Sequence, residues 1–222
     1  QHGNYYYPTL SGVARSINFY PIEPEKYNEG IVNLAYGLGK YIVNGGLAIR
    51  YSPYHPENII QISSPEMALK NTQKNFYALN LDPEAFVASV DDAININTLK
   101  LRSADDAAGL KIVSSVYDYE NQMIRDGMMH QGKRIITFSN ILRHKFLPLN
   151  NIVKQLLEIG QSELNNPIEI EFAMDLEAKK NGFYEFNFLQ IRPIVEKEKA
   201  RKFNFDEIAD QKAIIKSNNV LG

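Results

Sequence analysis

The clearest hydrophobic pattern in the chain predicts one long helix. Apolar residues recur at helical spacing after Pro148 and fall on one face of the predicted helix. Three helix-ending residues, Asn165-Asn166-Pro167, follow directly. We therefore expect an amphipathic helix over residues 149–164.

The pattern then changes from helical spacing to alternation. Between residues 168 and 172, apolar side chains alternate with two glutamates, which predicts a strand with one buried face. Asn181-Gly182 is typical of a turn, and residues 183–194 predict the strand that returns beside the first. This part of the chain is therefore expected to form a β-hairpin.

Shorter apolar runs before residue 148 are bounded by Gly and Pro and predict further strands. A second helix is expected from Ser64-Pro65 to about Leu79, because Ser is a good N-cap and Pro suits the first turn. A short helix is expected over residues 40–43. The fold class that follows is α+β, with a mixed or antiparallel sheet flanked by helices. The predicted strands cover residues 12–19, 30–36, 47–51, 58–62, 93–101, 109–116 and 134–138.

Composition narrows the classes of function. The chain has 222 residues, which suits one large domain or two small ones. Its net charge of -2 gives no overall attraction to nucleic acid or membrane, and no apolar run is long enough to cross a bilayer. The absence of cysteine excludes disulfides and cysteine-based sites and is compatible with a cytoplasmic protein.

The acidic strand carries candidate metal ligands. Glu169 and Glu171 are two residues apart, so a strand places both carboxylates on the face opposite the apolar residues. Two carboxylates on one face repel each other unless a cation or a basic group lies between them. Mg²⁺ is commonly held by one or two carboxylates together with phosphate oxygens. The alternative is that both glutamates face solvent on the wet side of a sheet.

The return strand carries candidate phosphate ligands. Gln190 and Arg192 also share a face, and a guanidinium offers a planar fork of donors for phosphate oxygens. The hairpin thus has the residues of a platform for a metal and a phosphate. A cross-strand Arg–Glu pair at the surface is the alternative, and such a pair contributes little stability.

The hairpin resembles a known family. Residues 167–173 read Pro-Ile-Glu-Ile-Glu-Phe-Ala, and residues 188–194 read Phe-Leu-Gln-Ile-Arg-Pro-Ile. These segments resemble the Asp/Glu-Ile-Glu-aromatic and Leu/Val-Gln-x-Arg-Pro strands in the nucleotide-binding domain of phosphoenolpyruvate synthase and pyruvate phosphate dikinase. Residues 11–16 resemble the family's earlier Gly-Val-x-Phe-Thr segment, and residues 35–45 resemble its Gly-Leu-Gly-Glu-x-Val-x-Gly segment. The resemblance implies an ATP-grasp fold.

The resemblance also implies ATP and Mg²⁺ as cofactors and a role for each site residue. Glu171 would be a magnesium ligand, and Glu169 a second ligand or an acid that faces the nucleotide. Gln190 and Arg192 would contact the ATP phosphates, with Arg192 also catalytic, and Ser16 would lie near those phosphates. The family reaction moves phosphate from ATP to a histidine on a separate swivelling domain, which delivers it to pyruvate.

The resemblance sets the expected domain organisation as well. Residues 1–195 would be part of an ATP-grasp domain, and residues 196–222 a linker with the truncated first strand of the swivelling domain. Such a fragment would be inactive alone, and its partners would be nucleotide and the remaining domains of the same polypeptide, with neither nucleic acid nor membrane. Two positions depart from the family pattern, because Lys40 stands in the place of Glu and Arg15 in the place of an apolar residue.

Two alternatives to a phosphoenolpyruvate synthase remain open. One is another dikinase of the same build, such as pyruvate phosphate dikinase or a glucan or antibiotic phosphotransferase. The other is a nucleotide-binding or regulatory module that keeps the fold and has lost catalysis, which Lys40 favours.

Overall fold

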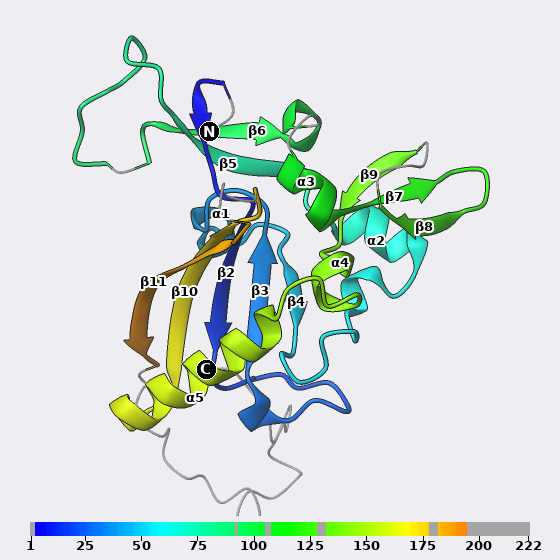
Figure 1. Cartoon of the computed structure of the whole chain (residues 1–222), viewed down its shortest axis with the longest axis vertical. Coiled ribbons are helices and arrows are strands. Elements are labelled where there is room, and N and C mark those ends of the chain that lie inside the picture. The colour runs from blue at the N-terminus through cyan, green and yellow to red at the C-terminus, as the bar shows by residue number, and fades with distance from the viewer. Residues whose placement is uncertain (1–2, 92, 105–107, 128–131, 178–181, 195–222) are drawn as a thin grey trace, which may run out of the picture.

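The computed structural model describes residues 3–91, 93–104, 108–127, 132–177 and 182–194 (Figure 1). Within these ranges the strands form three sheets, and all neighbouring strands in them run antiparallel. The α+β class predicted from the sequence is therefore confirmed. Residues 196–222, expected to hold a linker and a first strand, lie outside the described residues, as does Asn181 of the expected turn.

The largest sheet has five strands in the order β11-β10-β2-β3-β4. Its two outer strands at one side, β10 and β11, form the hairpin predicted from the acidic alternation, and β2 pairs with β10 across a long separation in sequence. Pro193 ends β11 at the edge of the sheet, where its missing N–H costs no ladder bond. The strands are β2 (Leu10–Arg15), β3 (Ile31–Ala35), β4 (Ile49–Tyr51), β10 (Ile168–Asp175) and β11 (Glu185–Pro193).

Two three-stranded sheets lie beyond one end of this sheet (Figure 1). The first has the order β1-β5-β6, and the second has the order β8-β7-β9. Their strands are β1 (Tyr5–Tyr6), β5 (Asn75–Asn80), β6 (Ile96–Lys100), β7 (Ser114–Asp118), β8 (Met123–Asp126) and β9 (Lys133–Ile136).

The helices are short except for the last one. The long amphipathic helix predicted from the sequence is confirmed with the predicted bounds as α5 (Leu149–Leu164). Among the described residues, no helix has both the length and the apolar character needed to cross a membrane. The other helices are α1 (Lys40–Val43), α2 (Pro65–Asn71), α3 (Ala108–Val113) and α4 (Ser139–Leu142), with 3₁₀ turns η1 (Tyr27–Glu29), η2 (Ile60–Ile62) and η3 (Leu101–Ala104).

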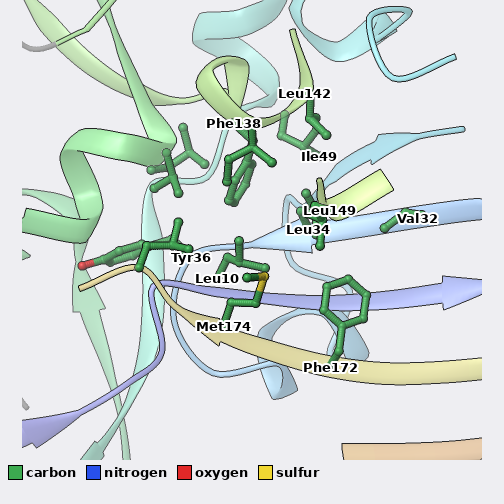
Figure 2. Close-up of a cluster of buried hydrophobic side chains, with 14 of the residues drawn as sticks. Leu10, Val32, Leu34, Tyr36, Ile49, Phe138, Leu142, Leu149, Phe172 and Met174 are labelled. Carbon is green, nitrogen blue, oxygen red and sulfur yellow. The ribbon is translucent and has the colours of Figure 1, made fainter. Parts of the chain in front are cut away.

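The main core lies against one face of the five-stranded sheet, where α5 crosses it. Alternate residues of β10, β2 and β3 point to this face, and Figure 2 shows Phe172, Leu10 and Leu34 among the buried side chains. Gly160 lets α5 approach the sheet closely, because a Cβ there would lie 2.6 Å from the Cδ1 atoms of both Ile168 and Ile191. Because successive side chains of a strand point to opposite faces, the polar residues of these strands lie on the other face of the sheet.

Three of the shorter sequence predictions were wrong. Residues 58–62 contain the 3₁₀ turn η2 in place of a strand. The helix that starts at Ser64 ends at Asn71, eight residues before the predicted end, and the chain continues as β5. The segment over residues 109–116, predicted as one strand, is divided between α3 and β7.

The packing of α5 on the sheet can be tested with a matched pair of substitutions on that helix. Leu157 is 5% exposed and Ile159 is 60% exposed. Leu157→Ala leaves a cavity and should lower the free energy of unfolding by about 2–4 kcal/mol. Ile159→Ala should change it by about 0.5 kcal/mol or less. Denaturant unfolding measures both, and equal losses would contradict this placement of the helix.

Candidate functional site

The face of the five-stranded sheet opposite α5 brings the hairpin's polar residues together. Glu169 of β10 lies directly between Arg192 of β11 and Arg15 of β2 in the strand register. Glu171 lies opposite Gln190 in the same register. The predicted face assignment is therefore confirmed for Glu169, Glu171, Gln190 and Arg192, and the structure adds Arg15 to them.

Glu169 is the best-enclosed charged residue of this face. Its side chain is only 4% exposed, and each of its carboxylate oxygens accepts hydrogen bonds from a different arginine. Arg15 Nε donates to Oε2 at 2.5 Å, and Arg192 donates to Oε1 through Nε at 2.8 Å and through Nη2. A buried carboxylate needs such partners, because an unpaired charge removed from water is strongly destabilising.

The electrostatics of Glu169 follow from these contacts. Burial alone would raise the pKa of the Glu169 carboxyl, but the hydrogen bonds and charges of Arg15 and Arg192 outweigh burial and hold this pKa below its ordinary value. The same contacts raise the pKa of Arg192. Because the folded-state pKa of Glu169 is the lower one, the network stabilises the fold above the ordinary glutamate pKa. That contribution is lost as the pH falls through the lowered pKa.

The two arginines keep donors for a further partner. Their side chains are 45% exposed for Arg15 and 56% exposed for Arg192, although the carboxylate between them is buried. The bonds to Glu169 use Nε of Arg15, and Nε and Nη2 of Arg192. A guanidinium has five N–H groups, so each arginine retains N–H donors at the surface of the sheet.

The next row of the same face is polar except at Val13, which is buried. Beyond Glu171 and Gln190 it continues through Val13 and Asn33 to Arg50 on β4. The guanidinium of Arg50 is held by protein acceptors, because its Nη2 donates to Asn18 Oδ1 at 2.8 Å. Glu171 is half-buried, and a register shift follows it directly in the β10–β11 ladder. Such bulges re-aim the side chains beside them.

The glycine turn identified in the sequence is fixed near one end of this face. Ser11, which shares the face with Glu171, donates from its hydroxyl to the carbonyl oxygen of Gly37 at 2.8 Å. Leu38 N–H donates to the carbonyl oxygen of Tyr77 at 3.0 Å. Gly37 has φ of +90°, and a Cβ there would lie 2.8 Å from that same carbonyl oxygen, so the turn requires glycine.

Ser16 does not join the other site residues predicted from the sequence. Its hydroxyl accepts a hydrogen bond from Ile168 N–H at 2.9 Å, and its own N–H donates to the Ile168 carbonyl at 2.9 Å. It lines a cavity of about 540 Å³ beside α5, together with Leu157 and Gln161. The side chain follows Arg15 in sequence and points away from the face that carries Glu171.

Arg15 is the residue that sequence reasoning did not assign to the site. The sequence does mark it, because Arg15 is the one charged residue in the segment over residues 10–19. Its partner Glu169 lies 154 residues further along the chain. Only the pairing of β2 with β10 shows that the two side chains meet.

The carboxylates of this face do not form a metal cage by themselves. Among the residues that the structure describes, no group of three or more His, Cys, Asp or Glu side chains could hold a metal ion. Both oxygens of Glu169 are engaged by arginine, which leaves Glu171 as the available carboxylate of the pair predicted from the sequence. This donor set fits Mg²⁺ only where phosphate oxygens and water supply the other ligands, as is usual for that ion.

The α+β fold is consistent with a nucleotide-binding domain of ATP-grasp-like type. The family model of the pyruvate phosphate dikinase AMP/ATP-binding domain matches residues 4–213, so the chain belongs to that family. None of the curated proteins matches the chain. The match supports an ATP- or AMP-binding part of a phosphotransferase of the phosphoenolpyruvate synthase and pyruvate phosphate dikinase type.

The ionic contacts of Glu169 can be tested through the pH dependence of stability. Glu169→Gln leaves two arginines without their shared anion and should lower the free energy of unfolding at neutral pH by about 1–3 kcal/mol. The difference in free energy of unfolding between the variant and the unchanged protein should shrink as the pH falls through the lowered pKa of Glu169. Denaturant unfolding over a pH series measures both effects.

A matched control removes an exposed carboxylate. Glu84 is exposed and forms no ion pair with any described residue. Glu84→Gln should change the free energy of unfolding by less than about 0.5 kcal/mol across the series. A Glu169→Gln effect that is equally large at low pH would contradict the ionic account.

Proposed function

We propose that the polar face of the five-stranded sheet binds Mg-ATP in a phosphoenolpyruvate synthase-like phosphotransferase. The observation that supports this most is the register of β10 and β11, which sets Glu171 opposite Gln190 and Glu169 opposite Arg192 on one accessible face. The family model covers nearly the whole chain and describes an AMP/ATP-binding domain. A nucleotide site needs N–H groups that donate hydrogen bonds to phosphate oxygens, a carboxylate that binds the metal, and an amide. This face has all three.

The arginines would bind the phosphates. Arg192 and Arg15 both keep N–H donors beyond those that contact Glu169. Glu169 would hold the two guanidinium groups in place before the nucleotide arrives, which lowers the cost of ordering them on binding. Gln190 would donate its amide to a phosphate oxygen. Arg192 would stabilise charge on the phosphate as it is transferred.

The metal would be held mainly by Glu171. Its carboxylate is half-buried on the same face, next to the residues that would hold the phosphates. Mg²⁺, when bound, would neutralise part of the phosphate charge. Glu169 would be a second ligand only if it released one arginine, so we assign it chiefly to positioning the arginines.

The wider reaction follows from the family resemblance. Phosphate would pass from ATP to a histidine on another domain of the same polypeptide, and then to pyruvate. Another dikinase of this family would use the same nucleotide face, since the acceptor is bound elsewhere. The lack of cysteine is compatible with the cytoplasm, which we propose as the compartment.

A second candidate is a nucleotide-binding module without catalysis. Lys40, in the family position of a glutamate, begins α1 directly after the glycine turn. A cation there would bind phosphate without recruiting a metal. Nucleotide affinity that does not depend on Mg²⁺ would favour this candidate.

The assignment of Glu171 predicts a specific loss of metal dependence. Calorimetric titration of ATP, with Mg²⁺ and with a chelator, should show that Mg²⁺ strengthens binding to the unchanged protein. Glu171→Gln should weaken binding about tenfold with Mg²⁺ and leave the metal-free affinity nearly unchanged. Arg192→Gln should weaken both affinities, because its charge contacts phosphate directly.

Glu84→Gln is the control and should leave both ATP affinities unchanged, because this exposed carboxylate lies in the loop between β5 and β6, away from the polar face. In the protein with its remaining domains, Glu171→Gln should abolish formation of phosphohistidine from Mg-ATP. Phosphohistidine formation at the normal rate would contradict the assignment.

A further inference from the structure

A second concentration of positive charge lies outside the nucleotide face, in a cavity between the two three-stranded sheets. The cavity has a volume of about 550 Å³, and its lining shares no residue with the polar face. The residues that line it include five basic ones, Lys74, Lys100, Arg102, Lys133 and Arg134.

No carboxylate lines this cavity among the described residues. The remaining lining residues are neutral, although the chain as a whole carries a net charge of -2. The side chains of Lys74, Lys100, Arg102 and Lys133 form no ion pair within the part of the chain that the structure describes. Like charges gathered without a counterion repel one another, and a bound anion would relieve that repulsion.

Secondary structure fixes the backbone of these basic residues. Lys100 ends β6 and pairs in register with Asn75 of β5, and the Lys74 carbonyl accepts from Leu101 N–H at 3.0 Å. Arg102 follows on η3. The basic pair at the start of β9 belongs to the other sheet.

Part of the lining is apolar and well packed. Leu101, Val116 and Ile135 line the cavity and are all buried. Gln73, also in the lining, is fixed by three bonds, because its side chain accepts from Tyr36 N–H and donates to the carbonyls of Tyr36 and Asn75. The apolar residues and Gln73 therefore give the cavity a packed base, above which Lys74, Lys100, Arg102 and Lys133 are exposed.

We propose that this cavity binds a small polyanion, a molecule with two or more phosphate groups. Its volume is in the range of small-molecule sites. Four exposed basic residues around one concave space, Lys74, Lys100, Arg102 and Lys133, suit several negative charges close together better than a single carboxylate. A concave site also suits a small molecule better than a long polymer, which would need a continuous basic stripe. The site is separate from the proposed nucleotide face and does not depend on that assignment.

The test uses inorganic pyrophosphate as the probe, titrated into the chain by calorimetry in metal-free buffer at low ionic strength. The unchanged protein should bind pyrophosphate more tightly than inorganic phosphate, and added salt should weaken the affinity. The double substitution Lys100→Gln with Arg102→Gln should weaken pyrophosphate binding about tenfold or more. Circular dichroism melting curves of each variant verify that it is folded.

The matched control removes two positive charges elsewhere. Lys26 and Lys111 are exposed and lie outside the lining of the cavity. Lys26→Gln with Lys111→Gln should change the affinity less than about twofold, since the charge lost is exposed and outside the lining. An equal loss in both double variants would overturn the proposal, as would the absence of pyrophosphate binding.

A third comparison separates this cavity from the nucleotide face. If Arg192→Gln abolishes pyrophosphate binding while the Lys100 and Arg102 double variant retains it, the anion binds the sheet face and the proposal is wrong. Preferential binding of an acidic peptide over pyrophosphate would also overturn it, since the site would then be a protein-docking surface.

Discussion

The contact on which the polar face depends is the pair of arginines around the Glu169 carboxylate. The carboxylate is 4% exposed and sits between β2 and β11, so without Arg15 and Arg192 its burial would be strongly unfavourable. With them, the three side chains link three neighbouring strands across the face that α5 leaves uncovered. The arginines are held by the carboxylate yet remain about half exposed, which is the condition for binding a second anion.

Side-chain alternation makes one face of the five-stranded sheet apolar and buried and the other face largely polar. On one face, residues such as Phe172 and Leu10 form the core with α5. On the other, the same strands present Glu171, Gln190 and the arginines to solvent. The rigidity supplied by the buried face is what would hold the polar groups in a fixed geometry, and fixed geometry is what a phosphate-binding site requires.

The elements that depend on local pattern were predictable, and those that depend on distant partners were not. The helix over residues 149–164 was predicted with its bounds, because a periodic apolar face and consecutive breakers mark both ends. The run over residues 58–62 was mistaken for a strand, since a short apolar segment does not distinguish a strand from a 3₁₀ turn.

The same distinction holds for the site. Glu169, Glu171, Gln190 and Arg192 belong to one hairpin, so the two-residue spacing on each strand was enough to place them on one face. Arg15 comes from a strand far away in sequence, and its contact with Glu169 depends on the order of strands in the sheet.

The most direct test of nucleotide binding by the polar face is a crystal structure of the chain with Mg²⁺ and a non-hydrolysable ATP analogue. We expect phosphates against Gln190 and Arg192 with Mg²⁺ on Glu171, and a nucleotide bound on the α5 side of the sheet would contradict this assignment.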